Sequence, residues 1–412
     1  MTASQPGRAL EGIKVLDLSR VLAGPWSTQI LADFGADVLK VELPGKGDDT
    51  RGWGPPFLQL GDGSDDPQES AYYLCANRNK RSAAIDIAKP EGAAIVRRLA
   101  AEADILVENF KAGGLKKYGL HYEAIAAINP RIVYCSITGF GQNGPYADRG
   151  GYDFVAQGMG GFMSITGEEH GGPLRAGVAI ADLSTGMYAT VSVLMALRHA
   201  ERTGEGQQID LSLLDTQIAM LANQASNWLV GGVNPGRLGN RHPTVVPYKT
   251  FEVADGVMII AIGNDGQFRA FCKEMGVPEL ADDEKFSTGR ARLVNRDEIE
   301  AKVQDLVRDL ESGSLIDRLV ACGVPAGPVN TIRDIFEDPF VEHRGTVHRF
   351  RREDGVEIPT VAFPGKLSAT PADYRYHPPQ VGEHSREVLA DWLGLTGEDL
   401  AGLESGGVIS QR

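Results

Sequence analysis

The chain has 412 residues, of which 42% are hydrophobic and 23% charged, and its formal net charge is −14 at pH 7. This balance is typical of folded globular proteins and excludes extensive disorder, while the length favours two domains over one. The acidic net charge argues against nucleic acid as a partner.

Cysteine spacing and local composition narrow the class further. Cys75, Cys135, Cys272 and Cys322 form no CxxC pair, so a zinc site or a disulfide framework is excluded, and free thiols in a reducing cytoplasm are expected. The sequence has no HExxH motif and no carboxylate cluster at ligand spacing, so we expect no metal. It shows neither a signal-peptide pattern nor 18 consecutive apolar residues, and we expect no membrane segment.

The N-terminal part of the chain alternates strands and helices. Strands are predicted at 13–19, 36–42, 84–87, 104–108 and 131–137, and helices at 26–34 and 90–103. This alternation predicts a doubly wound α/β sheet. The turn after the first strand, 20–25 (RVLAGP), lacks the GxGxxG spacing of a dinucleotide site, so we do not expect NAD chemistry.

The rest of the chain has a different organisation. Helices are predicted at 181–201, 210–229, 265–275, 297–310 and 385–393, and strands at 248–253, 257–262 and 346–353. Asp255-Gly256 between two of these strands favours a hairpin turn. A loop rich in Gly, Pro, Asn and Arg at 231–247 indicates a boundary, and roughly 230–330 is predicted to be a smaller second domain.

One aspartate stands in an unusually apolar setting. Asp182 follows the small and apolar residues 176–181 and precedes an apolar pattern of helical spacing that includes Met187, Val191 and Leu194. It can be interpreted as a helix N-cap, whose oxygen accepts a free backbone N–H. It can equally be a half-buried, ionised carboxylate that acts as a nucleophile. The spacing alone leaves both interpretations open.

Two basic clusters stand out against the acidic background, 77–82 (NRNKRS) and 111–117 (KAGGLKK), the second directly after Asn109-Phe110. Both are predicted at strand ends or helix starts, where α/β sheets bind ligands, so they are candidates for phosphate recognition. A solvated charged face is the alternative. Among the histidines only His242, in GNRHP, lies in a loop that looks specialised, and it is a candidate substrate contact. No Ser–His–Asp set can be assembled.

Several segments, spread over nearly the full length, carry a resemblance: LEGIKVLDLSRVLAGPWSTQILADFGADVLKVELPGKGDDTR, NRNKRSAAIDI, ADILVENFKAGGLKKYGL, NPRIVYCSITGFGQNGP, GYDFVAQGMGG and AIADLSTGMYA. Together they resemble the family III CoA-transferases, the group that includes formyl-CoA:oxalate and carnitine CoA-transferases. Two later runs, GNRHPTVVPYKTF and IGNDGQFRAFCKEMGVPEL, are most similar to succinyl-CoA:dicarboxylate members, which use glutarate or 3-hydroxy-3-methylglutarate as acceptor.

The resemblance implies a fold and an assembly. The family has a large Rossmann-like doubly wound domain and a smaller α+β domain, and two subunits interlink like rings. For this chain it implies a large domain over 1–229, a small domain over 230–330, and a C-terminal segment, 331–412, that returns to the large domain. The expected assembly is a homodimer in the cytoplasm.

The resemblance also implies site residues. Asp182 matches the family's nucleophilic aspartate. The positions that line the CoA site in relatives are Val21, Ala23, Lys80, Asn109, Phe110, Gly114, Lys117 and Tyr118. Leu22 and Leu43 replace a glutamine and an arginine of formyl-CoA transferase, and the glycine-rich loop of that enzyme has no counterpart, which argues against formyl/oxalate specificity. No permanently bound cofactor is implied, because the CoA thioester is a substrate.

The expected chemistry follows from the residue type. A carboxylate with a pKa near 3.9 is ionised at neutral pH and needs no general base. Asp182 would attack an acyl-CoA to give an aspartyl-acyl anhydride, and the CoA thiolate would then form an aspartyl-CoA thioester. A dicarboxylate acceptor also needs a cation for its second carboxylate. The candidates are Arg78, Arg175, Arg241 and His242.

Two alternatives remain. An α-methylacyl-CoA racemase would share the fold and the aspartate, but it needs a second acid/base, a histidine in the family's G-H-D run. Here the run is Gly151-Tyr152-Asp153, and a tyrosine with a pKa near 10 is a poor base. The other alternative is a non-catalytic CoA-binding protein in which Asp182 only caps a helix.

Overall fold

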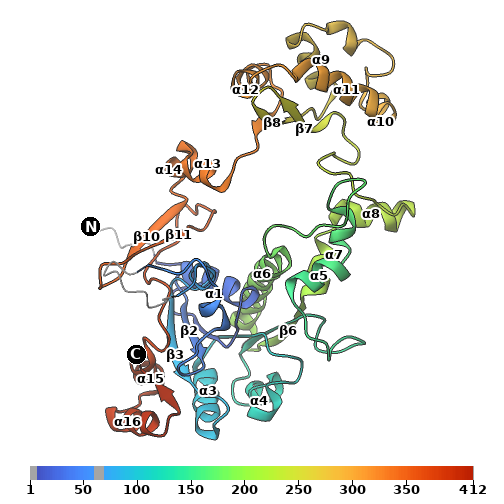
Figure 1. Ribbon diagram of the computed structural model, residues 1–412. Coiled ribbons are helices and arrows are strands. Elements are labelled where there is room, and N and C mark those ends of the chain that lie inside the picture. The colour runs from blue at the N-terminus through green and yellow to red at the C-terminus, as the bar shows by residue number, and fades with distance from the viewer. Residues whose placement is uncertain (1–6, 60–68, 412) are drawn as a thin grey trace. The chain divides into compact units, whose positions relative to one another are not determined.

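The computed structural model describes residues 7–59 and 69–411 and divides into two compact units (Figure 1). Unit 1 consists of Met1–Phe162, Arg175–Gly232 and Glu342–Arg412, and unit 2 consists of Met163–Leu174 and Val233–Val341. These limits differ from the predicted ones. The second boundary lies at 341 and not at 330, and residues 163–174 belong to unit 2 although they were predicted within the large domain.

Unit 1 is built on a seven-stranded sheet with the order β12-β3-β2-β1-β4-β5-β6. The strands are β1 (Lys14–Asp17), β2 (Asp37–Glu42), β3 (Lys80–Ile85), β4 (Ile105–Glu108), β5 (Val133–Thr138), β6 (Gln207–Ser212) and β12 (Ile409–Ser410). All neighbouring strands run parallel except β12, which pairs antiparallel with β3 at the edge. The order from β3 to β6 is that of a doubly wound sheet, which confirms the predicted α/β class.

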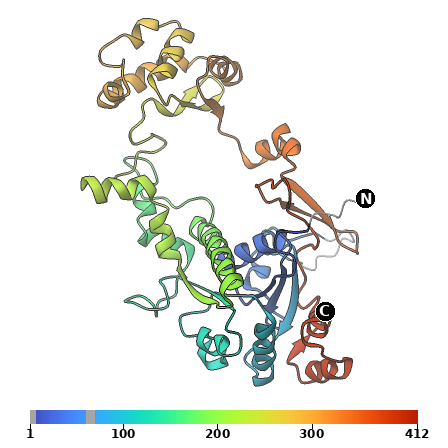
Figure 2. The same cartoon turned by 180° about the vertical axis from the view of Figure 1, so that it is seen from behind.

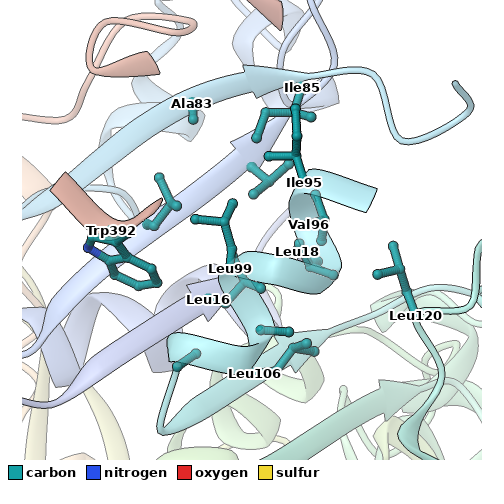
Figure 3. Packing of buried hydrophobic residues seen from close by; sticks show 14 of the residues in the cluster. Leu16, Leu18, Ala83, Ile85, Ile95, Val96, Leu99, Leu106, Leu120 and Trp392 are labelled. Carbon is teal, nitrogen blue, oxygen red and sulfur yellow. The ribbon is translucent and has the colours of Figure 1, made fainter. Parts of the chain in front are cut away.

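Each face of this sheet carries its own core, because successive side chains of a strand point to opposite faces. On β1, Leu16 belongs to one core and Val15 to the other, and Leu106 and Val107 of β4 divide in the same way. Figure 3 shows the first of these cores, in which Leu16, Leu106 and Trp392 lie together. The short apolar runs of the N-terminal sequence are therefore strands that are buried on both faces.

Helices cover both faces of the sheet. The first core includes residues of α3 (Pro90–Glu102), α4 (Tyr122–Ala126), α15 (Ser385–Leu393) and α16 (Gly397–Ser405). The second includes residues of α1 (Ala23–Asp33), α5 (Asp153–Met159), α6 (Ile180–Thr203) and α7 (Leu213–Ala219). The short helix α2 (Ala71–Leu74) precedes β3. Figures 1 and 2 show α6 beside α1 from both sides, so the start of α6 is fixed against the sheet by a neighbouring helix.

Helix α6 is also the one helix of the described residues that is long and apolar enough to cross a membrane by length and composition. Half of its most apolar 18-residue window, 50%, is buried inside the protein. Core helices meet the same criteria, and Val193 and Leu197 of α6 are such core residues.

The predicted helix at 210–229 is wrong in its first part. Residues Gln207–Ser212 form β6, which pairs with β5, and α7 and α8 (Ala222–Gly231) follow it. Ile209 and Leu211, two residues apart, both pack against the second core, which is the spacing of a strand. The apolar residues that follow have helical spacing, and they masked this short strand in the sequence.

The C-terminal residues of unit 1 form the hairpin β10 (Val347–Arg351) and β11 (Glu357–Val361), followed by α15, α16 and β12. A buried ion pair holds β11 to α1. The guanidinium of Arg78 donates to both carboxylate oxygens of Asp33, at 3.0 and 2.6 Å, and to Thr360 Oγ1 and the carbonyl of Val361. One side chain thereby joins α1, the start of β3 and the C-terminal hairpin.

Unit 2 is a smaller α+β body with its own core. Its antiparallel strands are β7 (Tyr248–Val253), β8 (Gly256–Ala261) and β9 (Ala326–Pro328). Its helices are α9 (Asp265–Glu274), α10 (Gly289–Val294), α11 (Arg296–Val307), α12 (Ser312–Ala321) and α13 (Ile332–Glu337), and α14 (Pro339–Arg344) crosses the boundary to unit 1. Phe251, Phe268 and Phe271 are fully buried in this core.

Replacing Arg78 by alanine should lower the free energy of unfolding of unit 1 by about 3–5 kcal/mol, because it leaves the buried Asp33 carboxylate without its partner. Urea unfolding followed by fluorescence or circular dichroism measures this loss. The matched control is Arg308→Ala in unit 2, which removes an exposed arginine with exposed partners and should leave the unfolding midpoint unchanged. Equal midpoints for the two variants would contradict a structural role for the Arg78–Asp33 pair.

Candidate active site

A cavity of about 630 Å³ lies at the carboxyl ends of β1 and β4. These are the two strands between which the strand order reverses, and open α/β sheets bind their ligands at this point. The cavity is lined by residues 20–23, 49, 53, 109–112, 137–139, 147 and 149–152, together with Asp182 and Leu213. It therefore brings together five residues that were predicted for the site: Asp182, Val21, Ala23, Asn109 and Phe110.

Asp182 is the third residue of α6, and its side chain is half-buried. The residue that precedes the helix is Ala179, which has no side-chain oxygen, so the interpretation of Asp182 as the N-cap is wrong. The free N–H groups at the helix start donate instead to a side chain of another helix. Asp153 Oδ1, on α5, accepts from the backbone N–H of Ala181 at 2.8 Å and of Asp182 at 3.4 Å. The Asp182 carboxylate is thus not occupied in capping its own helix.

Burial raises the pKa of Asp182 to about 7, and the neighbouring Asp153 carboxylate raises it as well. The expectation of a carboxylate with an ordinary pKa near 3.9 is therefore wrong. Its cause is the local environment, because water is partly excluded and a second carboxylate lies close by. Near neutral pH the free protein holds Asp182 in both its protonated and its ionised form.

The turn after β1 is held in an uncommon conformation. Val21 has φ = +69°, a left-handed value that costs a β-branched residue about 1–3 kcal/mol. Its N–H points to the carboxylate of Asp48, 3.3 Å from either oxygen. The ammonium of Lys40 donates to Asp48 and to the carbonyl of Ser19, at 2.9 Å each. The buried Lys40–Asp48 pair thus fixes the turn that lines the cavity beside α1.

The Lys40–Asp48 pair strongly lowers the pKa of its carboxylate. Burial alone would raise the pKa of Asp48, but Lys40 and the N–H and hydroxyl of Thr50 lower it to about 2. Neither side chain of the pair is exposed. A buried pair with these additional hydrogen bonds is strongly destabilised when one partner is removed.

The loop after β4 is joined to this turn. Asn109 Oδ1 accepts from the N–H of Arg20 at 2.9 Å, and its amide donates to the carbonyl of Arg20 at 2.6 Å. Glu108, at the end of β4, accepts from the N–H of Phe110 at 2.8 Å. Asn109 therefore acts as a clamp between two loops, and the ring of Phe110 remains available to a ligand, 5.4 Å from the guanidinium of Arg20.

Two smaller cavities adjoin this loop. One, of about 230 Å³, is lined by Phe110, Tyr118 and Leu43 among others, and it is mainly apolar. The other, of about 260 Å³, is lined by Gly114, Lys111 and Glu108 among others. Lys117, also predicted for the site, has its ammonium 4.7 Å from the centre of the Tyr118 ring. A mainly apolar cavity beside a polar one suits a nucleotide base and its phosphate groups.

The cluster at 77–82 is not an open phosphate site, contrary to its prediction. Lys80 is fully buried in β3, where it donates to Asp17, Asn77 and the carbonyl of Pro25. Burial lowers its pKa to about 8, although Asp17 opposes the shift. The guanidinium of Arg78 is likewise held in a buried ion pair with Asp33. Arg78 and Lys80 are neutralised by carboxylates that lie far earlier in the sequence, so neither is free to bind a phosphate group.

The remaining predicted cations lie in different settings. Arg175 is exposed in unit 1, its guanidinium is 5.8 Å from the Phe154 ring, and it forms no ion pair with a carboxylate of the described residues. Arg241, in unit 2, is paired with the buried Glu300 at 3.0 Å. His242 Nδ1 accepts two backbone N–H groups, from Thr244 and Val245, so its ring can offer only Nε2–H to a ligand. It can thus offer a ligand one hydrogen-bond donor.

Sequence reasoning missed three polar or aromatic residues of the cavity wall, Arg20, Trp53 and Arg149, and it considered Tyr152 only as a poor base in the racemase alternative. Arg149 forms no ion pair within the described residues and stacks on Tyr146, with 4.1 Å between the guanidinium and the ring centre. Its neighbours are glycines and an aspartate, so nothing in its local sequence distinguished it from a solvated loop residue. Among the described residues no group of three or more metal ligands is found.

Comparison with known proteins identifies this arrangement. The family model of CoA-transferase family III matches residues 10–385. The chain belongs to CoA-transferase family III. This confirms the resemblance predicted from the sequence, and with it an enzyme of the CoA-transferase class whose substrate is a CoA thioester.

Individual relatives are similar over nearly the whole chain. A succinate–glutarate CoA-transferase of Agrobacterium fabrum is 51% identical over 385 residues, which cover 93% of this chain and 95% of the relative. A succinyl-CoA:glutarate CoA-transferase of Homo sapiens is 42% identical and covers 98% and 91% of the two chains. The crystal structure of a CAIB/BAIF family protein from Brucella suis matches with a TM-score of 0.83 at 47% identity, over 94% of this chain and 100% of that one.

Replacing Asp48 by asparagine should weaken CoA binding at least about tenfold, because the Val21 turn loses its anionic acceptor and shifts. Isothermal titration with CoA measures the affinity. The matched control is Asp33→Asn, which disturbs an equally buried ion pair that does not contact the Val21 turn. Both variants should lose stability, but only Asp48→Asn should lose affinity, and a similar loss in both would contradict a specific role for Asp48.

Proposed function

We propose that this enzyme transfers CoA from succinyl-CoA to a dicarboxylic acid, glutarate or 3-hydroxy-3-methylglutarate, through covalent intermediates on Asp182. The observation that carries the proposal is the position of Asp182. Among the described residues it has no cation partner, and it lies in the cavity at the switch point of the sheet, beside residues that match the CoA site of the family. The names of the relatives from Agrobacterium fabrum and Homo sapiens support succinyl-CoA as donor and glutarate as acceptor.

The first half of the reaction runs in two steps. An ionised oxygen of Asp182 attacks the thioester carbonyl, the C–S bond breaks, and CoA leaves as its thiolate, which gives a mixed aspartyl-succinyl anhydride. The thiolate then attacks the carbonyl of Asp182, the anhydride C–O bond breaks, and succinate leaves. Asp182 now carries CoA as a thioester. The acceptor carboxylate repeats both steps in reverse, and no proton is consumed.

Binding energy from CoA is needed because the anhydride is uphill. Contacts with the distant adenosine and phosphate groups can offset this cost only if CoA is held in place while its thiolate is free. We assign this role to the two clamped loops, with Phe110 and Tyr118 beside the base and Lys111 and Arg149 beside the phosphates. Lys80, fully buried in β3, is left out of this assignment.

The acceptor requires a cation for its second carboxylate. Arg78 is excluded from this role because its donors are used by Asp33, Thr360 and Val361. Arg175 is our candidate in unit 1, because it forms no described ion pair and lies seven residues before Asp182 in the segment that leads into α6. Arg241, in unit 2, already has Glu300 as its partner.

The isomerase alternative is not favoured. The relatives from Agrobacterium fabrum and Homo sapiens are both named CoA-transferases. Tyr152 lines the cavity at the place where racemisation would require a histidine. A phenol with a pKa near 10 cannot accept a proton efficiently at neutral pH.

The assembly we propose is a homodimer in a reducing, cytoplasmic compartment. One face of α6 leaves large apolar side chains exposed: Met187, Tyr188, Val191, Leu194 and Met195. Apolar surface of this extent on a single chain is typical of a protein–protein interface, and the family forms interlinked dimers. The four cysteines are free, which fits a reducing compartment.

The proposal is tested by offering succinyl-CoA and a panel of mono- and dicarboxylic acids to the purified enzyme, with mass spectrometry of the products. We expect glutaryl-CoA or its 3-hydroxy-3-methyl analogue, and a loss of at least about 10³-fold in Asp182→Asn, because an amide cannot form the anhydride. Hydroxylamine should trap a derivative of Asp182 in the wild type. Deuterium exchange into a 2-methylacyl-CoA without any transfer would establish the isomerase, and tight CoA binding without turnover would establish a binding protein.

A second prediction concerns acceptor recognition. Arg175→Ala should raise the KM for glutarate about tenfold or more while the KM for succinyl-CoA changes little, because it removes a charge-assisted hydrogen bond to the distal carboxylate. The matched control is Arg131→Ala, an exposed arginine outside the cavity. Comparable acceptor KM values in Arg175→Ala and the wild type would assign the distal carboxylate to another cation.

A further inference from the structure

Asp153 stands at the centre of a hydrogen-bond chain that ends at the nucleophile. It is the first residue of α5, and only 9% of it is exposed. One of its carboxylate oxygens accepts from the N–H groups of Ala181 and Asp182. The other accepts from the side-chain amide of the fully buried Gln157 at 2.7 Å. Gln157 in turn accepts from the N–H of Ala176 at 2.9 Å.

This chain replaces a cap that α6 lacks. The first N–H groups of a helix need acceptors, and Ala179 offers no side-chain oxygen to them. Asp153 supplies that oxygen from a neighbouring helix, so the first turn of α6 depends on α5 for its geometry. The same contacts bring a second carboxylate close to Asp182 in a partly dehydrated cavity.

We propose that Asp153 is the positioning residue of the nucleophile: it fixes the first turn of α6 and holds a negative charge beside Asp182, and it thereby sets the pH range in which Asp182 attacks the thioester. This inference rests on the proposed function and adds to it a residue that never bonds to the substrate.

The other groups around Asp182 leave Asp153 as the main electrostatic influence from the protein. Tyr72, on α2, is a nearby phenol, and burial, with Asp182 next, raises its pKa to about 12, so it stays uncharged in the working range. Tyr152, Asp49, Arg20, Lys111 and Arg149 line the same cavity. Of all these groups only Asp153 shifts the pKa of Asp182 noticeably, and it shifts it upward.

The decisive variant is Asp153→Asn. Asparagine keeps one oxygen for the N–H of Ala181 but removes the charge, so Asp182 should ionise at lower pH. The acidic limb of kcat/KM, at about pH 7 in the wild type, should move down by about one pH unit. A second readout does not depend on turnover. A carbodiimide labels protonated carboxyl groups, and the midpoint of Asp182 labelling, followed by peptide mass spectrometry, should move by the same amount.

The matched control is Asp255→Asn in unit 2. Asp255 also accepts from the first turn of a helix, through the N–H and hydroxyl of Ser312, but it lies outside the cavity. The Asp255→Asn variant should have the same midpoints of the kcat/KM profile and of Asp182 labelling as the wild type. Asp153→Asn places its amide against that of Gln157, so the double variant with Gln157→Met, which removes the facing amide without adding a charge, keeps the test available if the single variant does not fold.

The outcomes separate this inference from the function on which it rests. If the wild type transfers CoA and the midpoints of Asp153→Asn coincide with those of the wild type, the inference is overturned and the function stands. If Asp153→Asn loses only thermal stability, with an unchanged pH profile, Asp153 is merely a structural cap and the inference is again overturned. If the wild type shows no transfer, the function fails, while the labelling midpoints still report on Asp153.

Discussion

The buried ion pairs at the carboxyl end of β1 and in the loop after β2 are the interactions on which the rest of the site depends. Lys40 with Asp48, and Lys80 with Asp17, are fully dehydrated. Lys40 also donates to the carbonyl of Ser19 in the turn after β1, and Lys80 to the carbonyl of Pro25 in the first turn of α1. These bonds tie the strands to the turn that begins α1, whose residues 20–23 line the cavity. Hydrophobic packing alone would not hold Val21 in its left-handed conformation.

The sequence predicted the sheet well because its strands are buried on both faces. A run such as Ile105–Val107 is apolar throughout, and no helix of three or four residues competes with it. β6 was missed because Gln207–Ser212 contains mostly polar residues and directly precedes an apolar segment of helical spacing. β3 was predicted to begin at 84 and begins at Lys80, since charged residues do not predict a buried strand unless their partners are known.

The site was predictable in part, for the same physical reason. Local sequence singled out Asp182 by its apolar setting, but its role, and the places of Asn109 and Phe110 at the CoA site, were predicted only from the resemblance to the family. Arg78 and Lys80 were misjudged because the function of a cation depends on whether a carboxylate faces it. Asp33 and Asp17 lie 45 and 63 residues away in the chain, so only the fold could show that they neutralise these cations. Arg149 shows the opposite error: it was not predicted as a site residue, yet it has no ion pair among the described residues, and only the structure shows this.

A nucleophile with a raised pKa has consequences for the direction of the proposed reaction. A more basic carboxylate is the better nucleophile once it is ionised, which favours its attack on the thioester. In the mixed anhydride, the thiolate can expel either Asp182 or the donor acid, and the weaker base leaves more readily. An ordinary carboxylic acid has a pKa near 4, whereas the site of Asp182 raises its pKa to about 7, so in the proposed reaction the donor acid would leave more readily than Asp182, and the same preference would slow the later step in which the acceptor half expels Asp182. The cost is a fraction of protonated, inactive enzyme near neutral pH. Burial and the Asp153 charge would thus steer the anhydride toward the aspartyl-CoA thioester.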